Sequence, residues 1–340
     1  MPPNKLRYYQ CLALALASLP LPALADPCLN PALSPCFDAN NLWLTSGPAH
    51  FVSMPDTDIR ADLVSLELAQ EFFRGPVTLR ANSPDPAGRE IRVVDDVADT
   101  SLLASGSVAR SLALSIALPI RSYQTGAGIG AVTSQSPSPP TTTAVRDPRI
   151  GLAYSFEQFF HVRGLGLKSY LETSLPLGDS AIFAGDRSLV VSPKILLSGH
   201  YDRFFGELSL GARLRQTSTI GDTRIGSQAL LALGFGVDAL PHDLLFVGVE
   251  AWALPALTST TAQQVAATES VTLTPAEWLV SAQSRFASGS RWLLQIGGGS
   301  GLPLSSVHHV GAGSEHFLGV TTPEFRFIAA GRYEFSLSDL

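Results

Sequence analysis

The sequence predicts an all-β protein: a single antiparallel up-and-down transmembrane β-barrel of about twelve strands, with both termini on the periplasmic side. Three observations support this prediction. Only 15% of the 340 residues are charged and 45% are hydrophobic, whereas about 25% are charged in an average soluble domain. Segments of about 9 to 12 residues alternate apolar and polar side chains, which is the length that a tilted strand needs to cross a bilayer. Long and short connections between these segments alternate along the chain.

The N-terminus predicts export. Residues 1–25 combine a basic start with the apolar stretch Cys11–Leu19 and the small residues of Ala23–Ala25, the pattern of a cleaved signal peptide. The apolar stretch is too short to remain as a membrane helix. Removing Lys5 and Arg7 from the 23 basic residues leaves 21 against 29 acidic ones, a net charge of −8. This balance argues against a nucleic-acid partner, which requires a basic surface.

Two cysteines remain after this segment is removed, Cys28 and Cys36. In an exported chain the default expectation for such a pair is a local disulfide, and the alternative is two free thiols without a role. Residues 26–60 form either a periplasmic tail or a segment tucked into the lumen, and the sequence leaves both open. The barrel is predicted to cover residues 61–340.

Twelve segments follow the period of two that places alternate side chains on opposite faces of a strand. They are expected at residues 62–74, 90–102, 109–121, 148–158, 164–177, 188–199, 203–216, 226–238, 243–255, 270–285, 291–302 and 323–336. Long connections fall near residues 75–89, 122–147, 178–187, 217–225, 256–269 and 303–322, and short ones near 103–108, 159–163, 200–202, 239–242 and 286–290. Consecutive strands of a barrel cross the membrane in opposite directions, so short turns collect at one end and long loops at the other. The longest loop, 122–147, is rich in Gly, Ser, Thr and Pro and is predicted to face solvent.

The last strand, 323–336, shows the pattern most clearly. One face carries Phe325, Phe327, Ala329, Gly331, Tyr333 and Phe335. The other face carries Glu324, Arg326, Ile328, Ala330, Arg332 and Glu334. In a membrane barrel the aromatic face meets lipid and the charged face meets a wet lumen.

Charged side chains of both signs are expected on the lumen face of several strands. They are Glu67, Arg121, Arg149, Lys168, Glu172, Lys194, Glu207, Arg213, Arg215, Glu250, Glu277, Arg285, Arg326, Arg332 and Glu334. They either line a narrow aqueous channel that selects solutes by its field, or pair across neighbouring strands and close a structural barrel. The nine basic and six acidic residues in this set favour pairing, because a strongly selective pore would show one sign.

Several short stretches together resemble one protein family. They are Asp38–Trp43 with Gly47-Pro48, Leu118-Pro119 before Tyr123–Gly126, Asp147–Ile150, Phe183–Asp186, Gly297–Gly301 and Thr322–Arg326. In this order they resemble the transmembrane barrel half of OmpA-family outer-membrane proteins of Gram-negative bacteria. The resemblance implies insertion into the outer membrane with the help of the barrel-assembly machinery. Such proteins often continue into a periplasmic peptidoglycan-binding domain. This sequence stops five residues after Phe335, so we expect no cell-wall tether.

The predicted function is a structural or small-solute channel (porin-like) role in the outer membrane, without enzymatic activity and without a cofactor. The alternative is a barrel-borne hydrolase acting on lipids, which would need a nucleophile–base pair near the membrane interface. His161, His200 and His242 fall in short turns instead, and no Gly-x-Ser-x-Gly motif occurs. The expected partners are outer-membrane lipid, the assembly machinery and small solutes.

Three histidines gather in the last long loop. His308, His309 and His316 lie there beside Glu315. Imidazoles with a carboxylate can capture a divalent metal, whereas a solvated loop that contains histidines by chance binds none. We predict no metal site.

Overall fold

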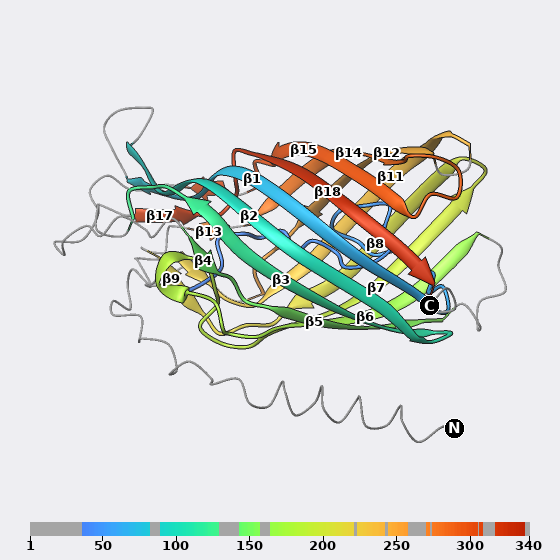
Figure 1. The fold of residues 1–340 in the computed structure, drawn as a ribbon. Helices are drawn as coiled ribbons and strands as arrows, with labels where there is room; N and C mark the ends of the chain where they lie inside the picture. The colour runs from blue at the N-terminus through green and yellow to red at the C-terminus, as the bar shows by residue number, and fades with distance from the viewer. Residues whose placement is uncertain are drawn as a thin grey trace, which may run out of the picture.

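Twelve antiparallel strands close into a barrel in the computed structural model, which describes residues 36–81, 89–128, 143–156, 164–220, 223–241, 244–257, 270–272, 274–304, 306–308 and 317–336. The barrel strands are β1 (Leu63–Ala81), β2 (Arg89–Ala109), β3 (Leu112–Gln124), β5 (Arg149–Ser155), β6 (Leu165–Ser174), β7 (Val190–Tyr201), β8 (Phe204–Arg213), β11 (Gln228–Leu240), β12 (Leu245–Ala253), β14 (Ala276–Arg285), β15 (Trp292–Gly301) and β18 (Phe325–Ser336). Each pairs with the next barrel strand, and β1 pairs with both β2 and β18 (Figure 1). This closed ring confirms the predicted all-β architecture and strand number.

The long connections carry shorter strands. They are β4 (Ala144–Val145), β9 (Ser218–Ile220), β10 (Thr223–Ile225), β13 (Ser270–Thr272), β16 (Ser306–His308) and β17 (Phe317–Val320), with one 3-10 turn at Ser180–Ile182. The labelled ones, β4, β9, β13 and β17, gather at one end of the barrel (Figure 1). Over the described ranges, no helix has both the length and the apolarity to cross a membrane.

β1 and β2 are longer than expected. Much of the predicted connection 75–89 is strand, because β1 runs to Ala81 and β2 starts at Arg89. Past an irregularity between Arg74 and Val77 the two strands remain paired to their ends. Burial of apolar side chains stabilises this extension. The buried cluster there contains Phe37, Ala39, Phe73, Val77, Leu79, Val93, Val94, Val97, Phe183 and Ile225.

Two other expected boundaries are wrong. The predicted turn 103–108 belongs to β2, and the chain reverses at residues 110–111. Of the predicted strand 270–285, only the part from Ala276 onward joins the barrel, while β13 pairs with β16 outside it. Pro275 stands between the two parts and has no amide hydrogen to extend a ladder.

Side chains alternate between the outside and the inside of the closed sheet. On β11, Leu233 and Phe235 are 62% and 54% exposed, while Ala232, which directly precedes Leu233, is buried. On β18, Phe327 is 50% exposed and Arg326 beside it is 2% exposed. The outer surface of the barrel is therefore apolar, and its interior holds the charged side chains together with a buried apolar cluster.

Residues 36–60, called the plug segment below, run through the inside of the barrel (Figure 1). At the end with the long connections, the Ser218 hydroxyl donates to the carbonyl of Cys36. At the other end the plug segment leads into β1, whose first residue, Leu63, pairs with Ser336 at the end of β18. The plug segment therefore spans the barrel lengthwise. Which membrane face each end meets remains a prediction.

Candidate functional site

The charged side chains expected in the lumen lie on barrel strands or directly after one. Thirteen of the fifteen are buried, and Arg215 and Arg285 are half-buried. Most of them contact one another or the plug segment. The lumen of the barrel, together with the plug segment, is therefore the candidate functional site.

Arg326 on β18 joins carboxylates from two other strands. Its Nε lies 2.8 Å from Glu277 Oε2 on β14, and its Nη1 lies 2.8 Å from Glu71 Oε1 on β1. The same Nη1 donates to Asn40 Oδ1 of the plug segment at 2.9 Å. Asn40 in turn donates to Glu71 and to Asp99 on β2, at 3.1 Å each. The plug segment thus completes a polar network on this side of the lumen.

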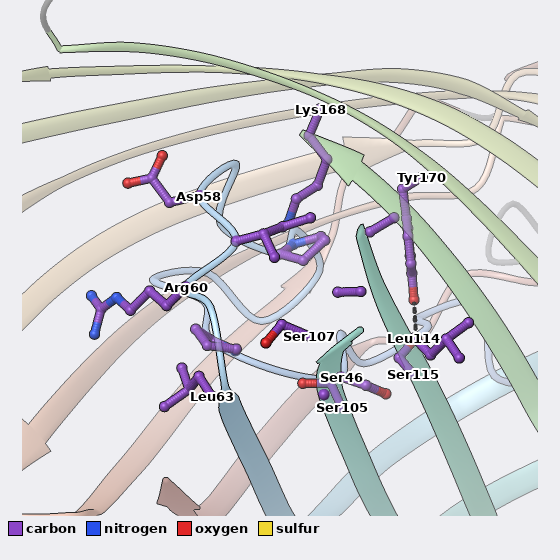
Figure 2. A pocket seen from close by; sticks show the side chains of 16 residues that line it. Ser46, Asp58, Arg60, Leu63, Ser105, Ser107, Leu114, Ser115, Lys168 and Tyr170 are labelled. Carbon is purple, nitrogen blue, oxygen red and sulfur yellow. Dashed lines mark hydrogen bonds between the residues drawn. The ribbon is translucent and has the colours of Figure 1, made fainter. Parts of the chain in front are cut away.

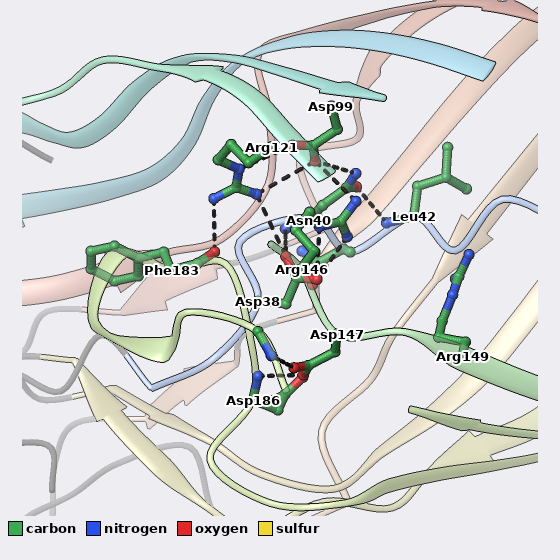
Figure 3. Close-up of polar contacts among 12 residues, drawn as sticks. Asp38, Asn40, Leu42, Asp99, Arg121, Arg146, Asp147, Arg149, Phe183 and Asp186 are labelled. Atoms are coloured by element: carbon green, nitrogen blue, oxygen red, sulfur yellow. Dashed lines mark hydrogen bonds and ion pairs between the residues drawn. The ribbon is translucent and has the colours of Figure 1, made fainter. Parts of the chain in front are cut away.

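Two further arginines extend this network toward the long connections (Figure 3). Arg121 Nε on β3 lies 3.0 Å from Asp99 Oδ1, and Arg146 Nη1 lies 3.0 Å from Asp99 Oδ2. Arg146 also binds Asp38 of the plug segment, with 2.6 Å between Nη2 and Oδ2. Because all four side chains are buried, loss of one partner would leave a buried charge uncompensated.

Asp147 holds the nearby connections together. Its carboxylate accepts hydrogen bonds from the backbone N–H groups of Gly178 and Asp186, at 2.7 Å each (Figure 3). Burial raises the pKa of Asp147 to about 7, with the neighbouring carboxylates of Asp38 and Asp186 acting in the same direction and the two N–H donors acting against it. This carboxyl therefore titrates near neutral pH.

Three cationic side chains from β5, β7 and β8 surround the indole ring of Trp43 in the plug segment. The guanidinium carbons of Arg149 on β5 and Arg213 on β8 lie 5.0 and 4.4 Å from the ring centroid, and Lys194 Nζ on β7 lies 5.8 Å from it. We call Arg149, Lys194 and Arg213 the cation cluster. Glu172 on β6 lies 2.9 Å from Lys194 Nζ and 3.5 Å from Arg149 Nε.

The cation cluster also binds main-chain carbonyls of the plug segment. Arg149 Nη2 donates to the Leu44 carbonyl at 3.1 Å, and Arg213 Nη2 donates to the Asn41 carbonyl at 3.0 Å. Other nitrogens of the two guanidinium groups are buried without a hydrogen-bond partner among the described residues. They are Arg149 Nε, Arg149 Nη1 and Arg213 Nε.

Phe51 fixes the plug segment in the middle of the lumen. It is fully buried, and the centroid of its ring lies 5.8 Å from the ring centroids of both Phe205 and Phe246. Gly234 on β11 and Gly248 on β12 leave the space that it fills, because a Cβ would come within 2.7 and 3.0 Å of the Phe51 ring. These glycines therefore allow an aromatic side chain of the plug segment to contact the wall.

The second half of the plug segment is held through its main chain. Glu250 on β12 accepts from the N–H groups of Val52 and Ser53, at 2.7 and 3.0 Å.

Arg332 Nε on β18 lies 2.7 Å from Glu67 Oε2 on β1. That pair joins the two strands that close the barrel.

Lys168 and Glu207 face the plug segment from β6 and β8. Lys168 donates to the carbonyl of Asp56. The Asp56 carboxylate lies 2.8 Å from His50 Nδ1. The Glu207 carboxylate is buried and has no hydrogen-bond partner among the described residues.

Two small cavities border the plug segment. One of about 40 Å³ lies against Ser46, Asp58 and Arg60 of the plug segment, with Lys168 and Tyr170 on its far side (Figure 2). Another, of about 30 Å³, lies near His50 and Arg285. These volumes suit a few water molecules each.

Several residues of this site were not predicted from the sequence. Glu71 and Asp99 lie on the inward faces of β1 and β2. Glu71 follows Glu67 by four residues on the same strand and so lies on the same face, a pattern from which it could have been predicted. Asn40 and Trp43 lie in an irregular segment, where no periodicity marks a buried face.

Some predicted residues lie outside the described part of the chain. Cys36 is disulfide-bonded, but Cys28, its predicted partner, is not among the described residues. The same holds for His309 and His316. Within the described residues, no group of three or more His, Cys, Asp or Glu side chains could hold a metal ion.

No protein-family model matches this sequence, and no curated protein matches it. Among solved structures, an outer membrane channel from Pseudomonas putida F1 is similar with a TM-score of 0.56 and 13% identity, over 84% of this chain and 100% of that chain. The NanC porin gives a TM-score of 0.45 at 9% identity, over 79% and 98% of the two chains. A FadL homologue of Pseudomonas aeruginosa gives 0.39 at 10%, over 80% and 90%. The first likeness shows the fold alone, a β-barrel like that of the Pseudomonas putida channel, and it gives no specific support to the OmpA family.

Proposed function

We propose that this protein is a channel for small solutes in the outer membrane of a Gram-negative bacterium, and that the plug segment keeps it closed in the conformation described above. The apolar outer surface of the barrel suits a lipid environment. The signal predicted at residues 1–25 would deliver the chain across the inner membrane.

The observation that supports this proposal is that a separate stretch of chain fills the lumen. Barrels of about eight strands are filled by their own inward side chains, and wider barrels enclose additional space. Here, Trp43, Phe51 and Met54 of the plug segment occupy that space and are buried. The wall facing them carries charged side chains, which would hydrate and line an aqueous passage if the plug segment withdrew.

The polar contacts of the plug segment are of a kind that water can replace. Over the described residues it forms no strand with the wall. These contacts are hydrogen bonds and ion pairs that involve side chains such as Glu250, Asn40 and Arg213. Each such bond contributes only about 1 kcal/mol net, or 1.5–3 kcal/mol when charged. A segment held in this way can leave without unfolding the barrel.

A permanently closed structural barrel is the competing function, and the buried ion pairs of Arg326 and Arg121 favour it. The two functions differ in conductance. The lipid hydrolase considered from the sequence gains no support from the described residues. Membership of the OmpA family remains a prediction on which the channel proposal does not depend.

The test fixes the plug segment to the wall with a reversible bond. The hydroxyls of Thr57 in the plug segment and Ser198 on β7 are in contact, so a Thr57→Cys/Ser198→Cys variant can form a disulfide across this contact. In planar bilayers we expect discrete current steps from the wild type, silence from the oxidised variant, and recovery of the steps after reduction. The single-cysteine variants and the wild type with reductant are the controls, because the reductant also acts on Cys36.

Two outcomes would contradict the proposal. Steps from the oxidised variant equal to those of the wild type would show that the plug segment does not close the passage. Silence of the wild type and of the reduced variant, in protein that migrates as a folded barrel, would identify a structural barrel.

A further inference from the structure

The lumen has two walls of different charge at the level of residues 38–44. On one side, Arg326 and Arg121 face Glu71, Asp99 and Glu277, and each guanidinium is paired at 2.8–3.0 Å. The opposite side is formed by β5 to β8, which carry the cation cluster. Charge is therefore compensated on the first side and positive on the second.

The excess positive charge of the cation cluster follows from its partners. Glu172 is shared between Lys194 and Arg149. The nearby Asp186 is already paired with Arg215, with 3.3 Å between Oδ1 and Nη1. Arg213 has no carboxylate within ion-pair distance among the described residues, so one negative charge faces three positive ones.

Buried guanidinium nitrogens without acceptors are costly. Arg149 Nη1 and Arg213 Nε have no hydrogen-bond partner among the described residues, and Arg149 Nε has only the ion-pair contact with Glu172 at 3.5 Å. A buried charged donor left unsatisfied destabilises the fold. Carbonyls of Leu44 and Asn41 satisfy one nitrogen of each group. The ring of Trp43 covers the charges, and such a cation–π contact compensates them only in part. The plug segment thus satisfies this site only in part.

An oxyanion would satisfy the site more fully. Its oxygens accept charge-assisted hydrogen bonds from guanidinium groups, often two at a time. We propose that the cation cluster is a binding site for oxyanions and that the channel passes small solutes bearing a carboxylate or phosphate group. The second clause rests on the proposed function, whereas the binding site does not. In the closed conformation, Trp43 and the carbonyls of Asn41 and Leu44 occupy the site.

Inorganic phosphate is the probe, and Trp43 reports its binding. Phosphate that enters the cation cluster displaces the indole ring from the two guanidinium groups, so the tryptophan emission of the purified barrel is expected to change in a saturable way. Trp43→Phe is expected to remove this change and identify its source among the four tryptophans. Arg213→Gln is expected to weaken phosphate binding by about tenfold or more, because one charge-assisted contact is worth about 1.5–3 kcal/mol.

Arg213→Lys and Arg285→Gln are the controls. The first keeps a positive charge and is expected to retain much of the phosphate response, which separates loss of binding from a folding defect. The second removes a half-buried lumen cation that is paired with Glu334 at 2.7 Å, outside the cation cluster, and is expected to leave the response unchanged. No phosphate-dependent emission change, or an equal loss in Arg213→Gln and Arg285→Gln, would overturn the oxyanion site.

Selectivity tests the solute class separately. In the conducting state, the reversal potential in a KCl gradient should show that chloride permeates more readily than potassium. Arg213→Gln should lower this anion-to-cation permeability ratio about threefold or more. Conductance without a preference for anions would overturn the proposal that the solutes are anionic, but it would not contradict the channel function. A phosphate response without any conductance would support the binding site and overturn the proposed channel.

Discussion

At the residue scale, glycines shape the lumen as much as charged side chains do, because they leave space for other groups. Gly234 and Gly248 lie where a Cβ would come within 3.0 Å of the Phe51 ring or closer. A methyl group at either position would compete with the aromatic ring for the same space. The position of the plug segment therefore depends on two residues that offer no functional group.

Gly234→Ala should loosen the plug segment. Its Cβ would lie 2.7 Å from the Phe51 ring, and such overpacking typically costs about 1–3 kcal/mol. We expect a higher open probability in planar bilayers with unchanged barrel folding.

Gly206→Ala is the matched control, because its Cβ would meet only the Gly234 carbonyl at 3.9 Å. Equal gating of the two variants would show that contact with Phe51 does not hold the plug segment.

At the element scale, each strand separates two environments by its period of two. On β11, Leu233 and Phe235 point outward and Ala232 points inward. The same strand therefore meets an apolar environment on one face and the lumen on the other. A charge added to the outer face should be costly in proportion to its depth in the membrane.

Leu233→Arg should destabilise the barrel more than Leu240→Arg. Leu233 lies in the middle of β11 and Leu240 at its end, and both side chains are exposed on the outside. Arginine on a lipid face costs about 2–4 kcal/mol at the midplane and about 0–1 kcal/mol near an interface. Unfolding free energies in lipid vesicles measure the difference. Equal costs at the two positions would contradict a membrane belt around the barrel.

At the scale of the whole molecule, closure depends on the contact between the first and the last strand. β1 pairs with β18 from Leu63 to Arg74. Inside this seam the buried pair of Arg332 and Glu67 adds an ionic contact at 2.7 Å. The strands that it joins are separated by almost the entire barrel sequence.

Arg332→Met should destabilise the closed barrel by about 3–5 kcal/mol, because it leaves Glu67 buried without its partner. A Glu67→Gln/Arg332→Met variant should recover part of this loss. Denaturant midpoints of the wild type, both single variants and the double variant measure the coupling. Additive effects of the two substitutions would show that the pair contributes nothing to closure.

Much of the barrel could be predicted from the sequence. All twelve strands were expected close to where they occur, because alternation along each strand is a local pattern. The ends of β1 and β2 were misjudged, because Val77 and Val94 are buried in a cluster with residues from distant parts of the chain, such as Phe183, and not by the alternating pattern. For the site, inward charges on strands such as Arg326 could be expected. Asn40 and Trp43 could not, because an irregular segment has no period.

The sequence by itself predicted export, and it determined the twelve strands and the side chains that each strand turns outward or inward. The reason is that these properties depend on residues close together in the chain. Only the tertiary structure decided what fills the barrel and which charges remain uncompensated. The contact between Asn40 and Arg326 joins residues 286 positions apart. Whether Arg213 meets a carboxylate or an indole ring is decided by such long-range packing and not by its neighbours in sequence.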